Sequence, residues 1–241
     1  MTPIIAIANH KGGAGKTTTA YHLARHLADD GLAVLAIDLD DQGTLTSRSP
    51  IDRQFRHTVA DVLLREATLE QARQVAAVVH AGHLHLLAAD SRLSWAAAKI
   101  QAMSPNHMFL ARALERTASE YDAIVLDCPP SAGIIIVNAL MAATHLVIAA
   151  TPTIESYDGA LRMGSMLDEL AEATSRRPEY LGIVATQVVG NSKSHQRYLD
   201  LMRSNLLGCV PMRVGVDATQ QISDAYGPIA ARIWKEASDA A

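Results

Sequence analysis

The sequence is short of cysteine, of aromatic residues and of long polar tracts, and each shortage excludes a class of protein. Its two cysteines, Cys128 and Cys209, form no CxxC pair and lack metal-ligand spacing. This argues against a disulfide scaffold or a zinc module and is typical of a reducing cytosol. No tract is polar or repetitive enough to indicate disorder or an internal repeat. With 49% hydrophobic residues, the 241-residue chain is predicted to form a single α/β domain over residues 1–241.

The sequence also lacks a convincing membrane segment. Its most apolar stretch, residues 132–150, has about the ~20 residues that a spanning helix needs. Asn138, Thr144 and His145 interrupt it, and it divides into a buried helix followed by a buried strand. An apolar strand begins three residues after the start, so no signal peptide is expected. We predict a cytoplasmic protein with no stable membrane association.

A strong positive charge is missing as well, since the net charge is −4 and the pI is near 6.2. The charge is nevertheless uneven. Residues 176–235 contain eight Lys or Arg and four Asp or Glu, a local excess of positive charge in an acidic protein. A basic face is therefore compatible with the composition.

Short apolar strands alternate with helical stretches along the chain. Strands are expected at residues 4–8, 33–37, 84–87, 123–126, 146–149 and 181–185. Helices are expected at residues 16–30, 91–103, 108–119, 134–143, 157–171 and 194–207. Because each strand is apolar on both faces, this order predicts a mostly parallel twisted sheet with helices on both faces. Ligands of such sheets bind beyond the carboxyl ends of the strands.

The first strand leads into H-K-G-G-A-G-K-T-T, residues 10–18, directly before a helix. Glycines let backbone N–H groups converge on an anion without interference from side chains. Lys16 is placed to contact the β- and γ-phosphates, and the Thr17 hydroxyl to bind Mg²⁺. The common phosphate-loop pattern begins with glycine, but position 10 is histidine. The stretch therefore predicts a phosphate-binding loop of unusual type.

Carboxylates follow two of the predicted strands. Asp38 and Asp40 come after the second strand, on one side of its end by alternation. Asp127 ends the apolar run 123–126 and precedes Cys128 and two prolines. We expect these groups to meet at one Mg·phosphate centre, with water completing the shell of the metal ion.

These motifs resemble those of the ParA/MinD class of P-loop ATPases. The matching segments are K-G-G-x-G-K-T-T, D-x-D-x-Q-G at 38–43, and Y-D-x-I-x-x-D-C-P-P-S at 121–131. The resemblance implies a P-loop NTPase fold that hydrolyses ATP weakly, with ATP and Mg²⁺ as cofactors. By the same resemblance the nucleotide would be bound by Gly12, Gly13, Ala14, Gly15, Lys16, Thr17, Thr18 and, at the adenine, Pro211.

The resemblance also implies roles for individual side chains. Lys11 would reach across a dimer to the partner's nucleotide, with service to its own chain as the alternative. Asp40 would position or activate the attacking water together with Lys16 and Lys11 as the catalytic set. Thr17, Asp38 and Asp127 would hold Mg²⁺ or its water. Asp41 stands where the family has proline, which is expected to loosen the loop and add a charge.

The function implied by the resemblance is DNA or cargo partitioning. ATP would drive homodimerisation and non-specific DNA binding on the nucleoid, and a ParB-like or other cargo adaptor would stimulate hydrolysis. Candidate DNA contacts are Lys193, Arg197, Arg203 and Arg213. No helix-turn-helix precedes the first strand, as in the short form of the family. The alternative is a MinD-like membrane-cycling ATPase, which needs a basic amphipathic helix at the C-terminus. A redox relative is disfavoured because Cys128 and Cys209 do not match its cysteines.

Overall fold

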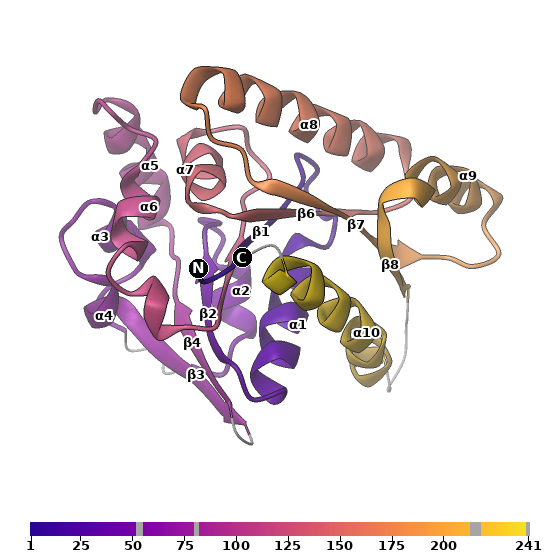
Figure 1. Cartoon of the computed structure of the whole chain (residues 1–241), viewed down its shortest axis with the longest axis horizontal. Coiled ribbons are helices and arrows are strands. Elements are labelled where there is room, and N and C mark those ends of the chain that lie inside the picture. The colour runs from indigo at the N-terminus through magenta and orange to yellow at the C-terminus, as the bar shows by residue number, and fades with distance from the viewer. Residues whose placement is uncertain (52–54, 80–81, 213–217, 240–241) are drawn as a thin grey trace.

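The computed structural model describes the backbone of residues 1–51, 55–79, 82–212 and 218–239, and within them the strands form one eight-stranded sheet (Figure 1). The strand order is β3-β4-β2-β5-β1-β6-β7-β8. Every neighbouring pair is parallel except β3 and β4, which are antiparallel. The strands are β1 (Ile4–Ala8), β2 (Ala33–Asp38), β3 (Arg73–Val79), β4 (Gly82–Leu87), β5 (Ala123–Asp127), β6 (His145–Ala150), β7 (Glu179–Val188) and β8 (Leu206–Pro211).

Helices cover both faces of this sheet, as the sequence predicts. They are α1 (Lys16–Asp29), α2 (Thr44–Arg48), α3 (Val59–Leu63), α4 (Leu69–Ala72), α5 (Arg92–Gln101), α6 (Phe109–Leu114), α7 (Ile134–Ala142), α8 (Ile154–Thr174), α9 (Lys193–Met202) and α10 (Ala218–Asp239). Short 3₁₀ turns occur at η1 (Ala118–Glu120) and η2 (Arg203–Asn205). One face is covered by α1 and α10, and the other by α7 and α8 (Figure 1).

The central strands are buried on both faces because nearly all of their residues are apolar. β5 and β6 are buried along their whole length. Each strand therefore contributes to two separate cores, one under each helical layer. The register places Asp38, the last residue of β2, directly beside Asp127, the last residue of β5. Two acidic strand ends thus meet in the middle of the sheet.

Several elements differ from the sequence predictions. The predicted helix 194–207 ends at Met202, and residues 206–207 open strand β8. The run Leu206–Pro211 is as apolar as the other strands, and it pairs with β7. The short helices α2, α3 and α4 were not predicted. Nor was β3, an antiparallel edge strand that begins with the polar residues Arg73 and Gln74. The long helix α10 was not predicted either, although its apolar residues pack under the sheet.

Candidate functional site

The predicted phosphate loop connects β1 to the first turn of α1. Gly13 and Gly15 have φ angles of 73° and 85°, in the left-handed region that glycine adopts at low cost. The Lys16 Nζ atom donates a hydrogen bond to the carbonyl oxygen of Lys11, 3.1 Å away. The lysine thus closes over its own loop. A loop of this shape at a helix N-terminus directs backbone N–H groups toward an anion.

The end of β7 supports the loop from below. Thr186 Oγ1 donates to the carbonyl oxygen of Ala14 at 2.8 Å, and Gln187 Nε2 donates to that of Gly13 at 3.0 Å. A Cβ atom placed on Gly15 would lie 2.8 Å from Thr186 Cγ2. The sequence did not predict Thr186 or Gln187, because they lie about 170 positions from the loop and belong to no recognised motif. They fix the loop to the sheet.

Asn9 joins the loop to α8 and was also missed. Its side chain is fully buried, and Nδ2 donates to the carbonyl oxygens of Ala149 and Ser156 at 2.9 and 3.2 Å. Its Oδ1 accepts from the backbone N–H of Lys11 at 3.0 Å. A Cβ atom on Gly159 would lie 2.3 Å from that Oδ1. The buried side-chain amide of Asn9 therefore links the backbone of Lys11 to α8.

Lys16 and Asp127 face one another in the interior. Burial lowers the pKa of the Lys16 ammonium, and the charge of Asp127 opposes this shift most strongly. Burial raises the pKa of Asp127 to about 8, the neighbouring Asp38 adds to the rise, and Thr17 and Lys16 oppose it. Neither carboxylate oxygen of Asp127 makes a hydrogen bond of standard geometry within the described part of the chain. Such a group needs a cationic ligand or a proton.

These residues suit Mg²⁺. An orphaned buried carboxylate beside a threonine hydroxyl is the oxygen donor set that this ion prefers. No cluster of three or more His, Cys, Asp or Glu that could hold a metal occurs among the described residues. Phosphate and water oxygens would therefore have to complete the shell. Cys128, next to Asp127, is buried, and burial raises the pKa of its thiol.

Both carboxylate oxygens of Asp38 accept hydrogen bonds from within the protein. Its Oδ1 accepts from the backbone N–H of Asp40 at 3.1 Å, and its Oδ2 accepts from the N–H and Oγ1 of Thr46 at 2.8 and 2.7 Å. Burial raises the pKa of Asp38, while the bonds from Thr46 lower it. Asp38 therefore anchors the segment that carries Asp40. Its predicted contact with a Mg²⁺-bound water stays a prediction.

Asp40 lies at the mouth of the phosphate loop. It lines a cavity of about 330 Å³ together with Gly12, Gly13, Ala14, Gly15, Lys16, Thr17, Thr18, Thr44, Arg48, Pro130 and Gln187. Its Oδ1 accepts from the backbone N–H of Gln42 at 3.1 Å. Arg48, which the sequence did not single out, donates from Nη1 to Thr18 Oγ1 at 2.8 Å. The cavity thus joins the predicted phosphate ligands to the predicted water-positioning carboxylate.

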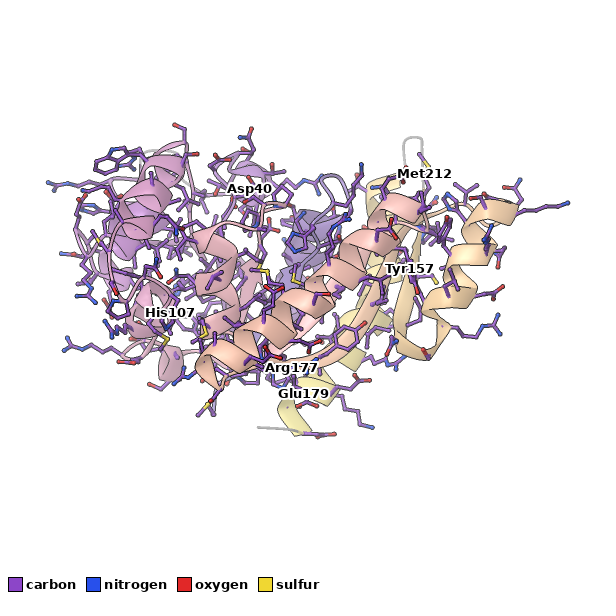
Figure 2. All side chains as sticks on the ribbon, turned by 90° about the horizontal axis from the view of Figure 1, so that it is seen from above. Asp40, His107, Tyr157, Arg177, Glu179 and Met212 are labelled. Carbon is purple, nitrogen blue, oxygen red and sulfur yellow. The ribbon has the colours of Figure 1, made fainter. Side chains whose placement is uncertain are left out.

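The remaining predicted residues follow β7 in the chain. Pro211 ends β8, and Figure 2 places the next residue, Met212, at the same edge of the molecule as Asp40. The adenine contact stays a prediction. Lys193 and Arg197 are exposed on α9 and line an open groove. Arg203 is ion-paired with Asp200 at 2.6 Å. Arg213 lies outside the described residues.

Lys11 has an exposed side chain whose surroundings are partly apolar. α8 passes beside it, so that the carboxylate of Glu155 feels its positive charge. The same helix exposes 54% of Ile154 and 56% of Leu161. These residues are seven positions apart, two turns of one helical face. The lysine therefore stands beside a helix face that exposes two apolar side chains, Ile154 and Leu161, with the exposed Asp158 between them.

Known proteins share these features. A family model described as an AAA domain matches residues 2–178. The chromosome partitioning protein ParA of Caulobacter vibrioides is 34% identical over 186 residues, 76% of this chain and 68% of that protein. The sporulation initiation inhibitor protein Soj of Bacillus subtilis is 38% identical over 149 residues, 61% of this chain and 58% of that protein. The chain thus spans about two thirds or less of the length of most of the first curated relatives.

A solved structure extends the similarity to the whole fold. The cobyrinic acid a,c-diamide synthase of Mycobacterium smegmatis, with bound ATP analogue and magnesium, has a TM-score of 0.85 at 26% identity. The match covers 98% of this chain and 96% of that one. Among the sequence relatives, those of Caulobacter vibrioides and Myxococcus xanthus are named as chromosome partitioning proteins. This chain belongs to the ParA-type family of P-loop ATPases.

Proposed function

We propose that this chain is a partition ATPase that binds Mg·ATP, dimerises in the ATP state, holds DNA without reading its sequence and hydrolyses ATP to ADP and phosphate. The observation that carries the proposal is the buried pair formed by Lys16 and the orphaned Asp127 at the mouth of the glycine loop. A buried cation, a buried unpartnered carboxylate and converging N–H groups suit a metal-bound polyphosphate and few other ligands.

The residues of the loop account for binding. The triphosphate would lie against the backbone of residues 12–18, and Lys16 would exchange the carbonyl oxygen of Lys11 for phosphate oxygens. Magnesium, when bound, neutralises phosphate charge, and Thr17 and Asp127 would hold it directly or through water. Asp40, held by Asp38 and Gln42, would orient the attacking water. Positioning and electrostatics supply most of the catalysis in such reactions.

The surface around Lys11 supports dimerisation. An exposed lysine beside the exposed Ile154 and Leu161 suits a contact that buries these two side chains and brings the ammonium to a second copy. Hydrolysis in the dimer would stay slow until an adaptor of the ParB-like kind, or another cargo protein, orders the site. The relatives named as chromosome partitioning proteins support this view.

The α9 surface is our candidate for DNA. Lys193 and Arg197 are exposed there, and neither is ion-paired with a described carboxylate. Arg203 is less available because Asp200 neutralises it. Contacts of this kind bind phosphates and not bases, so they give affinity without sequence reading. We accordingly expect a cytoplasmic, nucleoid-associated protein.

The membrane-cycling alternative has little support. The apolar side of α10, with Tyr226, Ile229 and Ile233, is buried against the protein and is not available to a lipid surface. Among the residues described, no helix combines the length and the apolar character that crossing a membrane requires.

Nucleotide binding and assembly test the proposal. Wild-type protein should bind a fluorescent ATP analogue in the presence of Mg²⁺, and Lys16→Ala should lose about 100-fold or more in affinity because a buried phosphate contact is removed. Lys11→Ala should still bind nucleotide but stay monomeric by light scattering when ATP is present. Lys99→Ala, an exposed lysine on α5, serves as the matched control. Absence of nucleotide affinity in the wild type would refute the proposal.

A further inference from the structure

Asp40 belongs to a tight turn whose second residue is Asp41. The backbone N–H of Gly43 donates to the carbonyl oxygen of Asp40 at 2.9 Å, which makes Asp40 to Gly43 the four residues of a β-turn. The second position of such a turn favours proline, because its ring presets φ. Asp41 has no ring. Its backbone therefore contributes less to fixing the turn.

The side chain of Asp41 has partners instead. Its Oδ2 accepts a hydrogen bond from Ser94 Oγ on α5, and its Oδ1 accepts from Gln42 Nε2 at 2.9 Å. The bond from Ser94, and then that from Gln42, lower the pKa of the Asp41 carboxyl. The carboxylate is thus charged at neutral pH, and bonds to a charged acceptor are stronger than neutral ones.

A pocket lies where the turn, α5 and the segment after β5 meet. Its volume is about 330 Å³, and it is lined by Leu39, Asp40, Asp41, Gln42, Leu93, Ser94, Ala97, Pro129, Pro130, Ser131 and Ile135. The hydrogen bond from Ser94 to Asp41 is a polar link between the turn and α5 beside this pocket. Without the link the turn has room to move.

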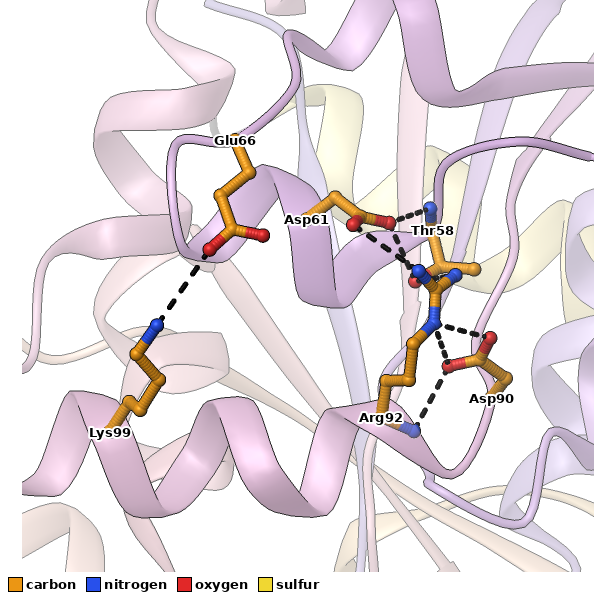
Figure 3. Close-up of polar contacts among 6 residues, drawn as sticks. All are labelled: Thr58, Asp61, Glu66, Asp90, Arg92 and Lys99. Carbon is orange, nitrogen blue, oxygen red and sulfur yellow. Dashed lines mark hydrogen bonds and ion pairs between the residues drawn. The ribbon is translucent and has the colours of Figure 1, made fainter.

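The helix that supplies Ser94 is itself anchored (Figure 3). Arg92 contacts Asp90 from Nε at 2.9 Å and Asp61 from Nη1 at 3.3 Å, and Nη2 approaches Thr58 Oγ1 at 3.4 Å. Lys99 reaches Glu66 at 3.7 Å at the other end of the helix. Leu93 is buried beneath. α5 is therefore a fixed support on which a mobile turn can be held.

We propose that the hydrogen bond between Asp41 and Ser94 acts as a latch. It fixes the turn to α5 and so holds the neighbouring Asp40 in position. Asp41 and Ser94 are positioning residues, because they act through Asp40 and do not touch the nucleotide cavity. The inference rests on the proposed function. It adds that a movement of α5 would be passed to Asp40 through the bond between Ser94 and Asp41. The segment 51–105 thereby gains a role in the reaction.

Amide hydrogen exchange of the nucleotide-free protein tests the latch without any activity. The amides of Gln42 and Gly43 both donate to Asp40, so they report the order of the turn. In Ser94→Ala and in Asp41→Ala we expect these two amides to exchange about tenfold faster, the loss of one charge-assisted bond. The double variant should be no faster than Asp41→Ala, because the bond from Ser94 is already lost in that variant. Gln101→Ala, at the exposed last residue of the same helix, should leave both amides unchanged.

Kinetics test the consequence for the reaction. Ser94→Ala should lower kcat about three- to tenfold while nucleotide affinity stays within about twofold, since the latch orients Asp40 and not the phosphates. Asp41→Pro should restore kcat in the Ser94→Ala background, because the ring fixes the turn without the serine. A purely structural role for Ser94 would not be rescued by a proline on another element.

The outcomes separate the two proposals. Unchanged exchange of Gln42 and Gly43 in both single variants, or additive effects in the double variant, would overturn the latch. Faster exchange together with an unaltered kcat would overturn its role in positioning Asp40. If the wild-type protein hydrolyses no ATP, the proposed function fails, and the exchange measurement still decides whether the latch exists.

Discussion

At the scale of single residues, Asp127 links the ligand to stability. Its carboxylate is buried with no hydrogen bond of standard geometry to the described residues, and burial raises its pKa from 3.8 to about 8. The folded nucleotide-free protein therefore retains a proton that the unfolded chain releases between these pH values. By linkage, stability falls as the pH rises through this window. The site therefore disfavours the ionised form of Asp127 unless a cation is bound.

Replacing Asp127 by Asn should remove that dependence. We expect Asp127→Asn to raise the free energy of unfolding at pH 8 by about 2–4 kcal/mol relative to wild type, with little change at pH 4. Urea unfolding of nucleotide-free protein at pH 4, 6 and 8 measures this difference. The same variant should lose Mg²⁺-dependent stabilisation by ATP. A stability difference that does not vary with pH would contradict the assignment.

Gly15 offers a second residue-scale prediction with an internal control. Its φ angle of 85° and the short distance to Thr186 leave no room for a side chain, whereas a Cβ atom on Gly12 would meet nothing within 4 Å. Gly15→Ala should therefore destabilise the nucleotide-free protein by about 1–3 kcal/mol, and Gly12→Ala by less than about 0.5 kcal/mol. Thermal unfolding of both variants checks this. Equal losses would mean that the loop adapts.

At the scale of elements, α10 braces the helix that begins at the phosphate site. The ring of His22 on α1 stacks on Tyr226 of α10 with centroids 4.7 Å apart and planes 8° from parallel. Tyr226 Oη and Thr19 Oγ1 are hydrogen-bonded at 2.9 Å, one turn from Lys16. A ring nitrogen of His26 lies 2.9 Å from the Ser223 carbonyl oxygen. The C-terminal helix thus stabilises the first turn of α1.

This contact predicts an acid-sensitive junction. Burial, with help from His26 and Arg48, lowers the pKa of His22 to about 4, and its Nδ1 has no partner among described atoms. Below about pH 6.5 His22 is protonated in the unfolded chain but stays neutral in the folded state. The stability present above that pH is therefore lost as the pH falls toward 4. His22→Phe keeps the ring stack. Relative to wild type, its free energy of unfolding should be about 1–2 kcal/mol more favourable at pH 4.5 than at pH 7.

Chemical unfolding of His22→Phe at the two pH values measures this gain. The exposed His83→Gln provides the control, with no expected dependence on pH beyond that of wild type. If both variants behave alike, the stack does not exclude the proton, and α10 is held by its other contacts.

Strands and their acidic ends could be predicted from the sequence because their causes are local. Apolar runs that end in Asp38 or Asp127 mark buried parallel strands whose ends meet. The supports could not be predicted in this way. Thr186 and Asn9 matter only through contacts that the fold creates across 172 and 140 positions. The edge strand β3 begins with two polar residues directly after helix α4, and β8 follows a helix so closely that the helical pattern continued into it.

At the scale of the whole molecule, one edge of the sheet collects the nucleotide cavity, Lys11 and the α9 surface. The opposite edge carries Arg177 and Glu179, far from Asp40 in Figure 2. On α9, Lys193 and Arg197 are exposed and make no ion pair with a described carboxylate, while α8 exposes Ile154 and Leu161. Dimerisation would double the number of phosphate contacts, so DNA affinity should depend on ATP. Two weak sites on one rigid dimer bind more tightly than one.

The final prediction separates specific placement from net charge. Lys193→Ala with Arg197→Ala should lower affinity for non-specific duplex DNA in the ATP state about tenfold or more, and reduce the slope of log affinity against log salt by about two for each protomer. ATP hydrolysis without DNA should not change. Arg176→Ala with Arg177→Ala removes the same charge beside Glu179, at the other edge, and should leave binding nearly intact. Fluorescence anisotropy at several salt concentrations measures both. Equal losses in the two double variants would show that overall charge, and not the α9 surface, holds the DNA.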